Sequence, residues 1–109
     1  MNHLDMEQLN ELKEVLEDEF QILIDTYLAD AQLRLKLIEE GLDTQNYEQV
    51  RLAAHSLKGA SANIGALILA QLCEQLEHYC KIGHNTSLSA LFKNSTDEFD
   101  IIKSLLANV

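Results

Sequence analysis

Hydrophobic positions recur at helical spacing along almost the whole chain. The first run follows Asp5 and Gln8, which have the spacing of a capping box, and it predicts a short helix over about residues 6–16. A second run begins at the acidic residues 17–19, which suit a helix N-terminus, and Gly41 with the polar residues DTQN that follow is expected to end it. Its single apolar stripe consists of Phe20, Ile24, Tyr27, Leu28, Ala31, Leu35, Ile38 and Leu42.

The second half of the chain repeats this periodicity three times. Residues 46–49 again have capping-box spacing, and the helix that they open is expected to close in a turn at 63–65. A further helix is predicted over about residues 67–83, and a last one over 88–106 after the polar loop GHNTS. Long helices with one apolar face and short connections predict an all-α fold. We expect an antiparallel four-helix bundle with a short additional N-terminal helix.

The composition agrees with a helical fold. The 109 residues include no proline and only four glycines, and a chain of this length suits one hydrophobic core, so we predict a single domain over residues 1–109. The start lacks the pattern of a signal peptide and no apolar run approaches a membrane span, so we expect a cytoplasmic protein. The start at Met1 favours a stand-alone protein over an excised domain, and a core complete in one chain favours a monomer.

The cysteines and neighbouring histidines raise the question of a metal site. Cys73 and Cys80 lie seven residues apart in one predicted helix, about 10 Å along its axis, which is too far for a disulfide, so free thiols are expected. Cys80 and His84 have the i, i+4 spacing of zinc ligands, with His78 nearby. Because Gly83 is expected to end the helix between them and Cys73 belongs to the core stripe, no metal site is predicted.

The net charge of −10 argues against nucleic acid or an anionic membrane as the main partner. This charge is unevenly distributed. Residues 1–48 carry thirteen acidic and three basic residues, whereas residues 49–96 carry two acidic and four basic ones. The stretch AAHSLKGASANIG, residues 53–65, lies in this positively charged segment.

On a helix, Arg51, His55, Lys58 and Ala62 form one stripe, each one position past a core residue. This offset places the imidazole of His55 on the flank of the bundle, where it meets solvent. A mid-helix glycine costs roughly 1 kcal/mol relative to alanine, so Gly59 suggests that something approaches the backbone closely here. Such surroundings suit an anion such as a phosphoryl group. From spacing alone, a surface histidine on a structural bundle remains an equal alternative.

The sequence HSLKGASANIG resembles the signature of histidine-containing phosphotransfer (HPt) domains, and the match is dense over residues 51–77. The resemblance implies that His55 accepts a phosphoryl group from the aspartyl-phosphate receiver domain of a hybrid sensor kinase and passes it to a response regulator. Lys58 then corresponds to the cation beside the phosphate, and Gly59 and Gly65 to the glycines of the signature. The alternative that we retain is a helical adaptor that docks receiver domains without accepting phosphate.

The chemistry of the residues agrees with this resemblance. A neutral imidazole can attack an aspartyl phosphate through one ring nitrogen if the other nitrogen has a hydrogen-bond acceptor. His55 and Glu77 both lie eleven positions from residue 66, the predicted centre of a helical hairpin, so Glu77 is the candidate acceptor for Nδ1. Some members of the family have glutamine at this place.

The expected partners are receiver domains, and the expected docking patch consists of Arg51, Ser56, Gly59 and Ala62, with apolar side chains from the preceding long helix. No glycine-rich phosphate loop or catalytic triad is present, so we predict a phosphate carrier and not an enzyme. No cofactor is expected on this chain, and magnesium is expected in the receiver domain of the partner. His3 and His78 are expected to be merely solvated.

Overall fold

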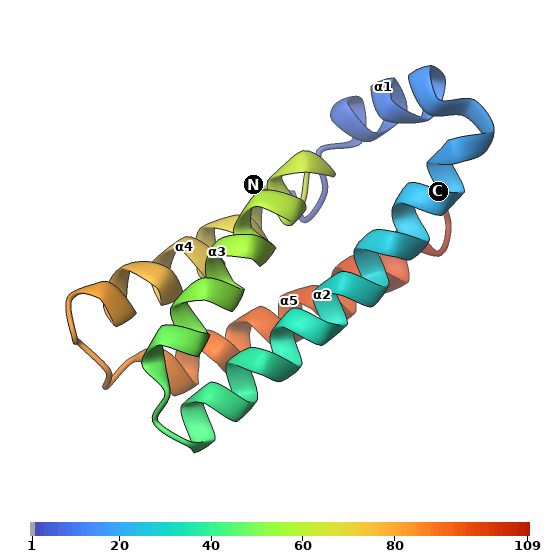
Figure 1. Ribbon diagram of the computed structural model, residues 1–109. Coiled ribbons are helices and arrows are strands. Elements are labelled where there is room, and N and C mark those ends of the chain that lie inside the picture. The colour runs from blue at the N-terminus through green and yellow to red at the C-terminus, as the bar shows by residue number, and fades with distance from the viewer. Residues whose placement is uncertain (1) are drawn as a thin grey trace.

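The computed structural model describes residues 2–109, and the elements within that range are all helical. The four long helices form an antiparallel bundle, as predicted (Figure 1). They are α2 (Phe20–Asp43), α3 (Tyr47–Asn63), α4 (Leu67–Lys81) and α5 (Leu88–Leu106). The short helix α1 (Met6–Leu16) precedes them, followed by a 3-10 turn at Glu17–Glu19. Met1, the first residue of the predicted domain, lies outside the described residues.

The bundle closes because each long helix packs against two others. Helix α3 contacts α2 and α4, and α5 contacts α4 and α2. The predicted apolar stripes face inward and form one core cluster, in which Ile24, Ile38 and Leu76 are almost completely buried. One polar contact lies inside this core, where the Tyr27 hydroxyl and the Ser61 hydroxyl are 2.9 Å apart. Burial raises the pKa of Tyr27 to about 12, so its proton is retained.

Two of the predicted helix caps are present in the structure. The Asp5 carboxylate accepts a hydrogen bond from the Gln8 backbone N–H at 3.2 Å, and the Asn46 side chain accepts one from Gln49 at the same distance. The turn between α3 and α4 also agrees with the prediction, because Gly65 has a φ of +81°, which an L side chain rarely adopts. The two predicted caps and the predicted turn at residues 63–65 are therefore confirmed.

Helix α2 ends at Asp43, the first residue of the polar segment predicted to end it, but Gly41 has a different role from the one expected. Gly41 is buried inside the helix. A Cβ atom at this position would lie 2.7 Å from the Val50 Cγ2 atom of α3. The glycine is therefore explained by the close approach of α2 and α3, and the helix ends two residues later. Helix α4 likewise ends at Lys81, earlier than the expected end near Gly83.

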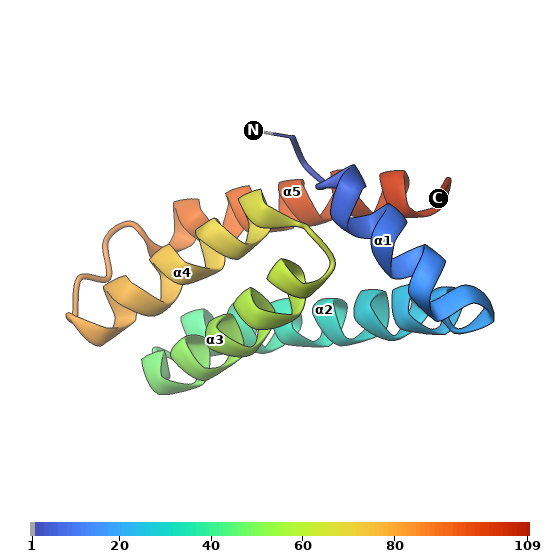
Figure 2. The same cartoon turned by 90° about the horizontal axis from the view of Figure 1, so that it is seen from above.

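The break predicted at residues 17–19 is present, and α2 begins directly after these residues, at Phe20. Residues 17–19 form the 3-10 turn, and Glu17 has a φ of 51° and a ψ of −117° although it is not a glycine. The chain bends sharply here, and α1 lies across the end of the bundle near the turn between α3 and α4 (Figure 2). The bend lets Leu9 of α1 be buried, with only 1% of the residue exposed.

The chain segment at residues 2–9, here called the strap, attaches this end of the molecule to the bundle. Leu4 belongs to the buried core cluster, and the Asp5 N–H donates to the Gly65 carbonyl at 2.9 Å. The Gln8 side chain donates to the carbonyls of Ala62 and Asn63, at 2.9 and 3.0 Å. The Ala62 carbonyl also accepts from the Gly65 N–H at 3.1 Å, and both carbonyls lie in the last turn of α3, where no helical N–H follows.

His3 is not merely solvated, so the prediction for this residue was wrong. Its Nδ1 atom lies 2.8 and 3.0 Å from the two carboxylate oxygens of Glu98 on α5. The Glu98 side chain is only 8% exposed, and a buried carboxylate requires a partner of this kind. The contact joins residues 95 positions apart, which no local pattern in the sequence indicates.

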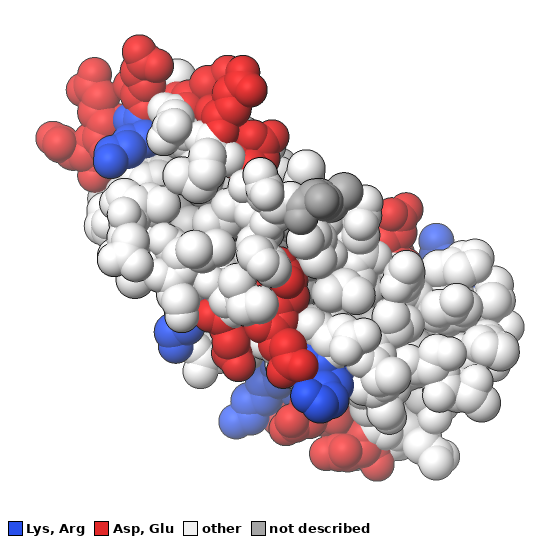
Figure 3. Space-filling model, turned by 180° about the vertical axis from the view of Figure 1, so that it is seen from behind, with Lys and Arg blue, Asp and Glu red and all other residues white. Residues whose placement is uncertain are grey.

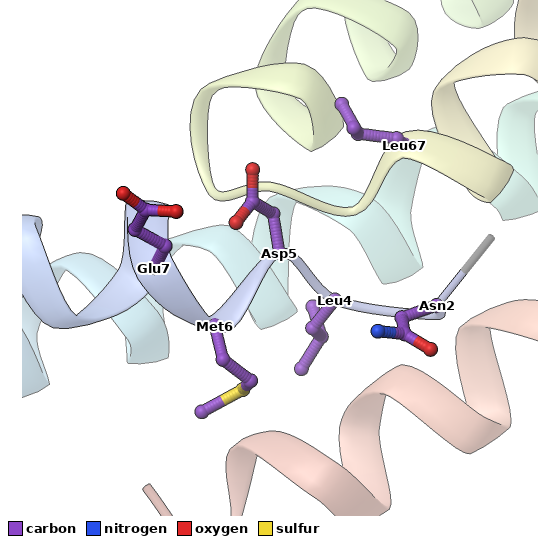
Figure 4. A pocket seen from close by; sticks show the side chains of 6 residues that line it. All are labelled: Asn2, Leu4, Asp5, Met6, Glu7 and Leu67. Carbon is purple, nitrogen blue, oxygen red and sulfur yellow. The ribbon is translucent and has the colours of Figure 1, made fainter.

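Two surface features lie at this end of the molecule, near the strap. An open groove of about 340 Å³ lies beside it, between residues 2–7 and Leu67 at the start of α4 (Figure 4). Acidic side chains gather at the end of the molecule formed by α1 and the 3-10 turn (Figure 3). Within residues 2–109, no helix is both long and apolar enough to cross a membrane.

Candidate functional site

His55 lies in the middle of α3 on the outer flank of the bundle. Its neighbours Ala54 and Leu57 are buried in the core, whereas 62% of the His55 side chain is exposed. This is the orientation expected from its offset of one position from the core stripe. The Nδ1 atom faces α4, where it lies 2.8 Å from the Oε2 atom of Glu77.

Glu77 connects His55 to Lys58. Its side chain is only 8% exposed, and its second oxygen, Oε1, accepts a hydrogen bond from the Lys58 ammonium at 2.9 Å. Burial raises the pKa of Glu77, but the hydrogen bonds from Lys58 and His55 outweigh this effect and hold the pKa below its ordinary value. The carboxylate is therefore ionised near neutral pH and acts only as an acceptor.

The charge of Glu77 determines which nitrogen of His55 carries the proton. An ionised carboxylate cannot donate, so the proton of the contact belongs to Nδ1 of His55. In the neutral imidazole this leaves the lone pair on Nε2. The arrangement therefore gives His55 one nitrogen that is held by α4 and one nitrogen with nucleophilic character.

Lys58 lies one helical turn beyond His55, and 31% of its side chain is exposed. The hydrogen bond to Glu77 is the main cause that raises its pKa above the ordinary value, so the ammonium remains charged. A flexible four-carbon stem allows such a cation to rotate toward an anion nearby. In this structure the cation is bound to a carboxylate, and an anion on His55 would compete for it.

The residues predicted for partner docking have different surroundings. Arg51 is held by Glu48, with a 2.9 Å bond from Nε and a second contact from Nη2, and the hydrogen bonding to Glu48 raises its pKa. Ser56 and Gly59 are exposed, and a Cβ atom at Gly59 would meet nothing within 4 Å. Ala62 is half-buried, at the end of α3 that the strap covers.

A groove of about 450 Å³ between α2 and α3 extends this surface. Arg34 and Leu37 of α2 line it together with Leu52, His55 and Ser56 of α3, and Leu52 is 53% exposed. Apolar side chains from the preceding helix were expected at this surface, but the particular residues were not predicted. Which leucines of an amphipathic helix stay exposed depends on how its neighbours pack, and the periodicity alone does not determine it.

The cysteines are free thiols in the structure. Cys73 is buried in the core, and burial raises its pKa to about 12, while Cys80 is half-buried. His84 lies beyond the end of α4, with its ring 5.4 Å from that of Tyr79. Within residues 2–109, no three histidine, cysteine, aspartate or glutamate side chains are close enough to hold a metal ion together.

Comparison with known proteins gives the family of this chain. The model of the Hpt domain family matches residues 22–109. The chain belongs to this family. A crystal structure of histidine-containing phosphotransfer protein B (HptB) from Pseudomonas aeruginosa PAO1 is similar, with 38% identity and a TM-score of 0.92 over 94% of this chain and 90% of that chain. A search of curated proteins gave no match.

A second solved structure supports the fold alone. It is an X-ray structure of a putative histidine-containing phosphotransfer protein from rice, with 22% identity, a TM-score of 0.82, and coverage of 94% of this chain and 76% of that chain.

The family match and the HptB structure together confirm the resemblance inferred from HSLKG and the prediction of an all-α bundle. As a member of the Hpt family, the protein has a histidine phosphotransfer role in phosphorelays, with kinases and response regulators as its class of partner.

Proposed function

We propose that His55 is the phosphoacceptor of this protein. The observation that carries the proposal is the contact of its Nδ1 with the buried Glu77, which leaves Nε2 as the nucleophile on an exposed ring. Lys58 is the group that stabilises the transferring phosphoryl, because its ammonium already lies in the same hydrogen-bonded cluster. Glu77 is a positioning residue, since it acts through the histidine.

The transfer step follows from these roles. The Nε2 lone pair attacks the phosphorus of an aspartyl phosphate, the bond between phosphorus and the aspartyl oxygen breaks, and the aspartate leaves as a carboxylate. The ring becomes positively charged while its proton stays on Nδ1, and the adjacent Glu77 carboxylate stabilises that charge. Lys58 then exchanges its contact with Glu77 for the phosphoryl oxygens. Transfer to the next aspartate is the reverse of this step.

The proposed donor is the receiver domain of a hybrid sensor kinase, and the proposed acceptor is the receiver domain of a response regulator. The chain acts as a carrier and not as an enzyme, so we expect the partner to supply the aspartate and magnesium. No cofactor is proposed for this chain itself. Cytoplasmic location and a monomeric relay state remain predictions of the same proposal.

The first experiment is transfer from a phosphorylated receiver domain to the purified protein and to His55→Gln. We expect acid-labile, alkali-stable phosphate on the unaltered protein alone, because a phosphoramidate has this lability. Equal labelling of both proteins would show that another residue accepts the phosphate. Binding to receivers without labelling of either protein would support the docking adaptor instead.

The docking surface can be tested separately. We propose that the receiver contacts Ser56, Gly59 and the groove beside Leu52, with Arg51 and Ala62 at its margins. Gly59→Glu adds a side chain to open space, so it is expected to preserve helicity while it blocks approach to His55. Gly59→Ala is the matched control and should transfer phosphate nearly normally. An unchanged transfer rate in Gly59→Glu would contradict this location.

A further inference from the structure

The strap is held to the bundle by a small number of contacts that a second chain is also able to provide. Residues 2–9 contribute two buried leucines, Leu4 and Leu9, to the core cluster. Their polar contacts are those of His3 with Glu98, of the Asp5 N–H with the Gly65 carbonyl, and of Gln8 with the end of α3. Each contact joins the strap to residues 61–109. None of them depends on the segment that links the strap to α2.

That linking segment is strained. Glu17 has a φ of 51° and a ψ of −117°, a conformation that glycine adopts readily and that is unfavourable for a residue with a Cβ atom. No proline or glycine occurs between residues 6 and 40, so no residue of this segment prevents a continuous helix through the bend. The contacts of the strap with the bundle hold residues 17–19 in the bent form.

We propose that at high protein concentration two copies of this chain exchange their N-terminal residues 2–16, so that the monomer expected for the relay is in equilibrium with a dimer. In the exchanged form, residues 17–19 become helical and join α1 to α2. The strap of each chain then takes the place of the other's strap, against the end of α3, Gly65 and Glu98 of α5. All strap contacts are then formed between chains instead of within one chain. The strain at both Glu17 residues is released, and this release favours the dimer as the protein concentration rises.

The exchange leaves the phosphotransfer site intact. His55, Lys58 and Glu77 all belong to the α3–α4 hairpin, and none of them contacts the strap. The dimer therefore presents two complete copies of the site on one particle. This inference does not depend on the role proposed for His55, because it rests on the strap and on Glu17 alone.

A pair of single-cysteine replacements tests the exchange directly. His3→Cys and Glu98→Cys are prepared as separate chains in a Cys80→Ser background, refolded together at high concentration and treated with a short bis-maleimide cross-linker, which spans the reach of the two original side chains. We expect a cross-linked heterodimer whose yield rises with concentration, because the strap of one chain then lies on α5 of the other. The double variant His3→Cys/Glu98→Cys on one chain shows whether the two positions are cross-linked in the monomer. Efficient cross-linking there without any heterodimer would overturn the proposal.

Two glycine replacements, at Glu17 and at Gln45, provide a test variant and its matched control. Glu17→Gly removes the strain of the closed form and weakens the continuous helix of the open form, so it should lower the dimer fraction by at least about 10-fold. Gln45 is the other non-glycine residue with a positive φ, at 57°, and lies in the α2–α3 turn outside the exchanged segment. Gln45→Gly should therefore leave the dimer fraction unchanged. Light scattering on chains without added cysteines measures both effects, and a dimer that is absent or insensitive to Glu17→Gly would refute the exchange.

Discussion

His55 and His3 each place Nδ1 2.8 Å from the Oε2 atom of a glutamate on another helix. Both glutamate side chains are 8% exposed, so the two histidine–carboxylate pairs have similar immediate geometry. The surroundings differ. The carboxylate of Glu77 also binds the ammonium of Lys58, and the exposed glycine at position 59 lies on the same helix. Glu98 has no second partner among the described residues, and its histidine belongs to the strap.

Under the proposed function, this difference explains why His55 is the phosphoacceptor and His3 is not. The carboxylate fixes the tautomer in both pairs, but a transferred phosphoryl group also requires a cation and an unobstructed approach. The pair on α3 and α4 has both. The pair at the strap connects the N-terminal segment to α5, and the contact gives the buried Glu98 side chain a hydrogen-bond partner. Four measurements test this distinction.

The largest expected effect comes from replacing each histidine by glutamine. His55→Gln should lose at least about 1,000-fold of phosphotransfer, because the amide has no comparable nucleophile. His3→Gln should transfer phosphate normally. Initial rates with a phosphorylated receiver domain measure both. Residual labelling of His55→Gln that disappears only when His3 is also replaced would show that both histidines accept phosphate, and it would contradict this prediction.

The cation is expected to have the next largest effect. Lys58→Ala should slow phosphotransfer by roughly 10–100-fold, since one charged donor to the phosphoryl oxygens is lost. Lys58→Arg retains the charge and should recover part of the rate. If Lys58→Ala transferred phosphate at the normal rate, Lys58 would have no place in the proposed mechanism.

Replacement of His3 should lower stability more than replacement of His55 does, which is the reverse of the order expected for phosphotransfer. His3→Ala leaves the buried Glu98 without its partner and should lower the free energy of unfolding by about 1–3 kcal/mol. His55→Ala leaves Glu77 bound to Lys58, so its cost should stay below about 1 kcal/mol. Urea denaturation of both variants gives the comparison. Equal losses would mean that Lys58 does not compensate for the missing imidazole.

The smallest expected effect is on the stability of the protein at acidic pH, through Glu77. The pKa of Glu77 in the folded protein lies below its ordinary value of 4.5, so its contribution to stability is present above that value and is lost as the pH falls through the folded-state pKa. Glu77→Gln should therefore flatten the pH dependence of the unfolding free energy below about pH 4.5. Denaturation curves between about pH 3 and pH 7 test this. The same acid dependence in both proteins would contradict the pKa direction.

Much of the fold could be predicted because its signals are local. The capping residues Asp5 and Asn46 act within one turn of the helices that they begin, and apolar spacing depends only on the helical period. The errors arose where distant packing overrode a local preference. Gly41 usually signals a helix end, but here it accommodates Val50 of a neighbouring helix. His3 was expected to be solvated, but the strap brings it to the buried Glu98 of α5.

The candidate site was likewise predicted in part. The spacing in HSLKG identified His55 and Lys58, and counting from the hairpin centre identified Glu77, because hairpin register follows from equal numbers of residues on both sides of a turn. The contact between Lys58 and Glu77, the pairing of Arg51 with Glu48 and the exposure of Leu52 were not predicted. Side-chain rotamers and the packing of neighbouring helices decide these features, and the sequence does not specify them separately.

The sequence by itself determined the helices, their inward faces and the chemical identity of the phosphotransfer motif, since each depends on residues within a few turns of one another. Only the tertiary structure decided that His3 meets Glu98 across 95 positions and that Glu17 is held in a strained bend. The physical reason is that burial of Leu4, Leu9 and Glu98 depends on which segments are brought together by the whole bundle. No periodicity along the chain encodes that arrangement.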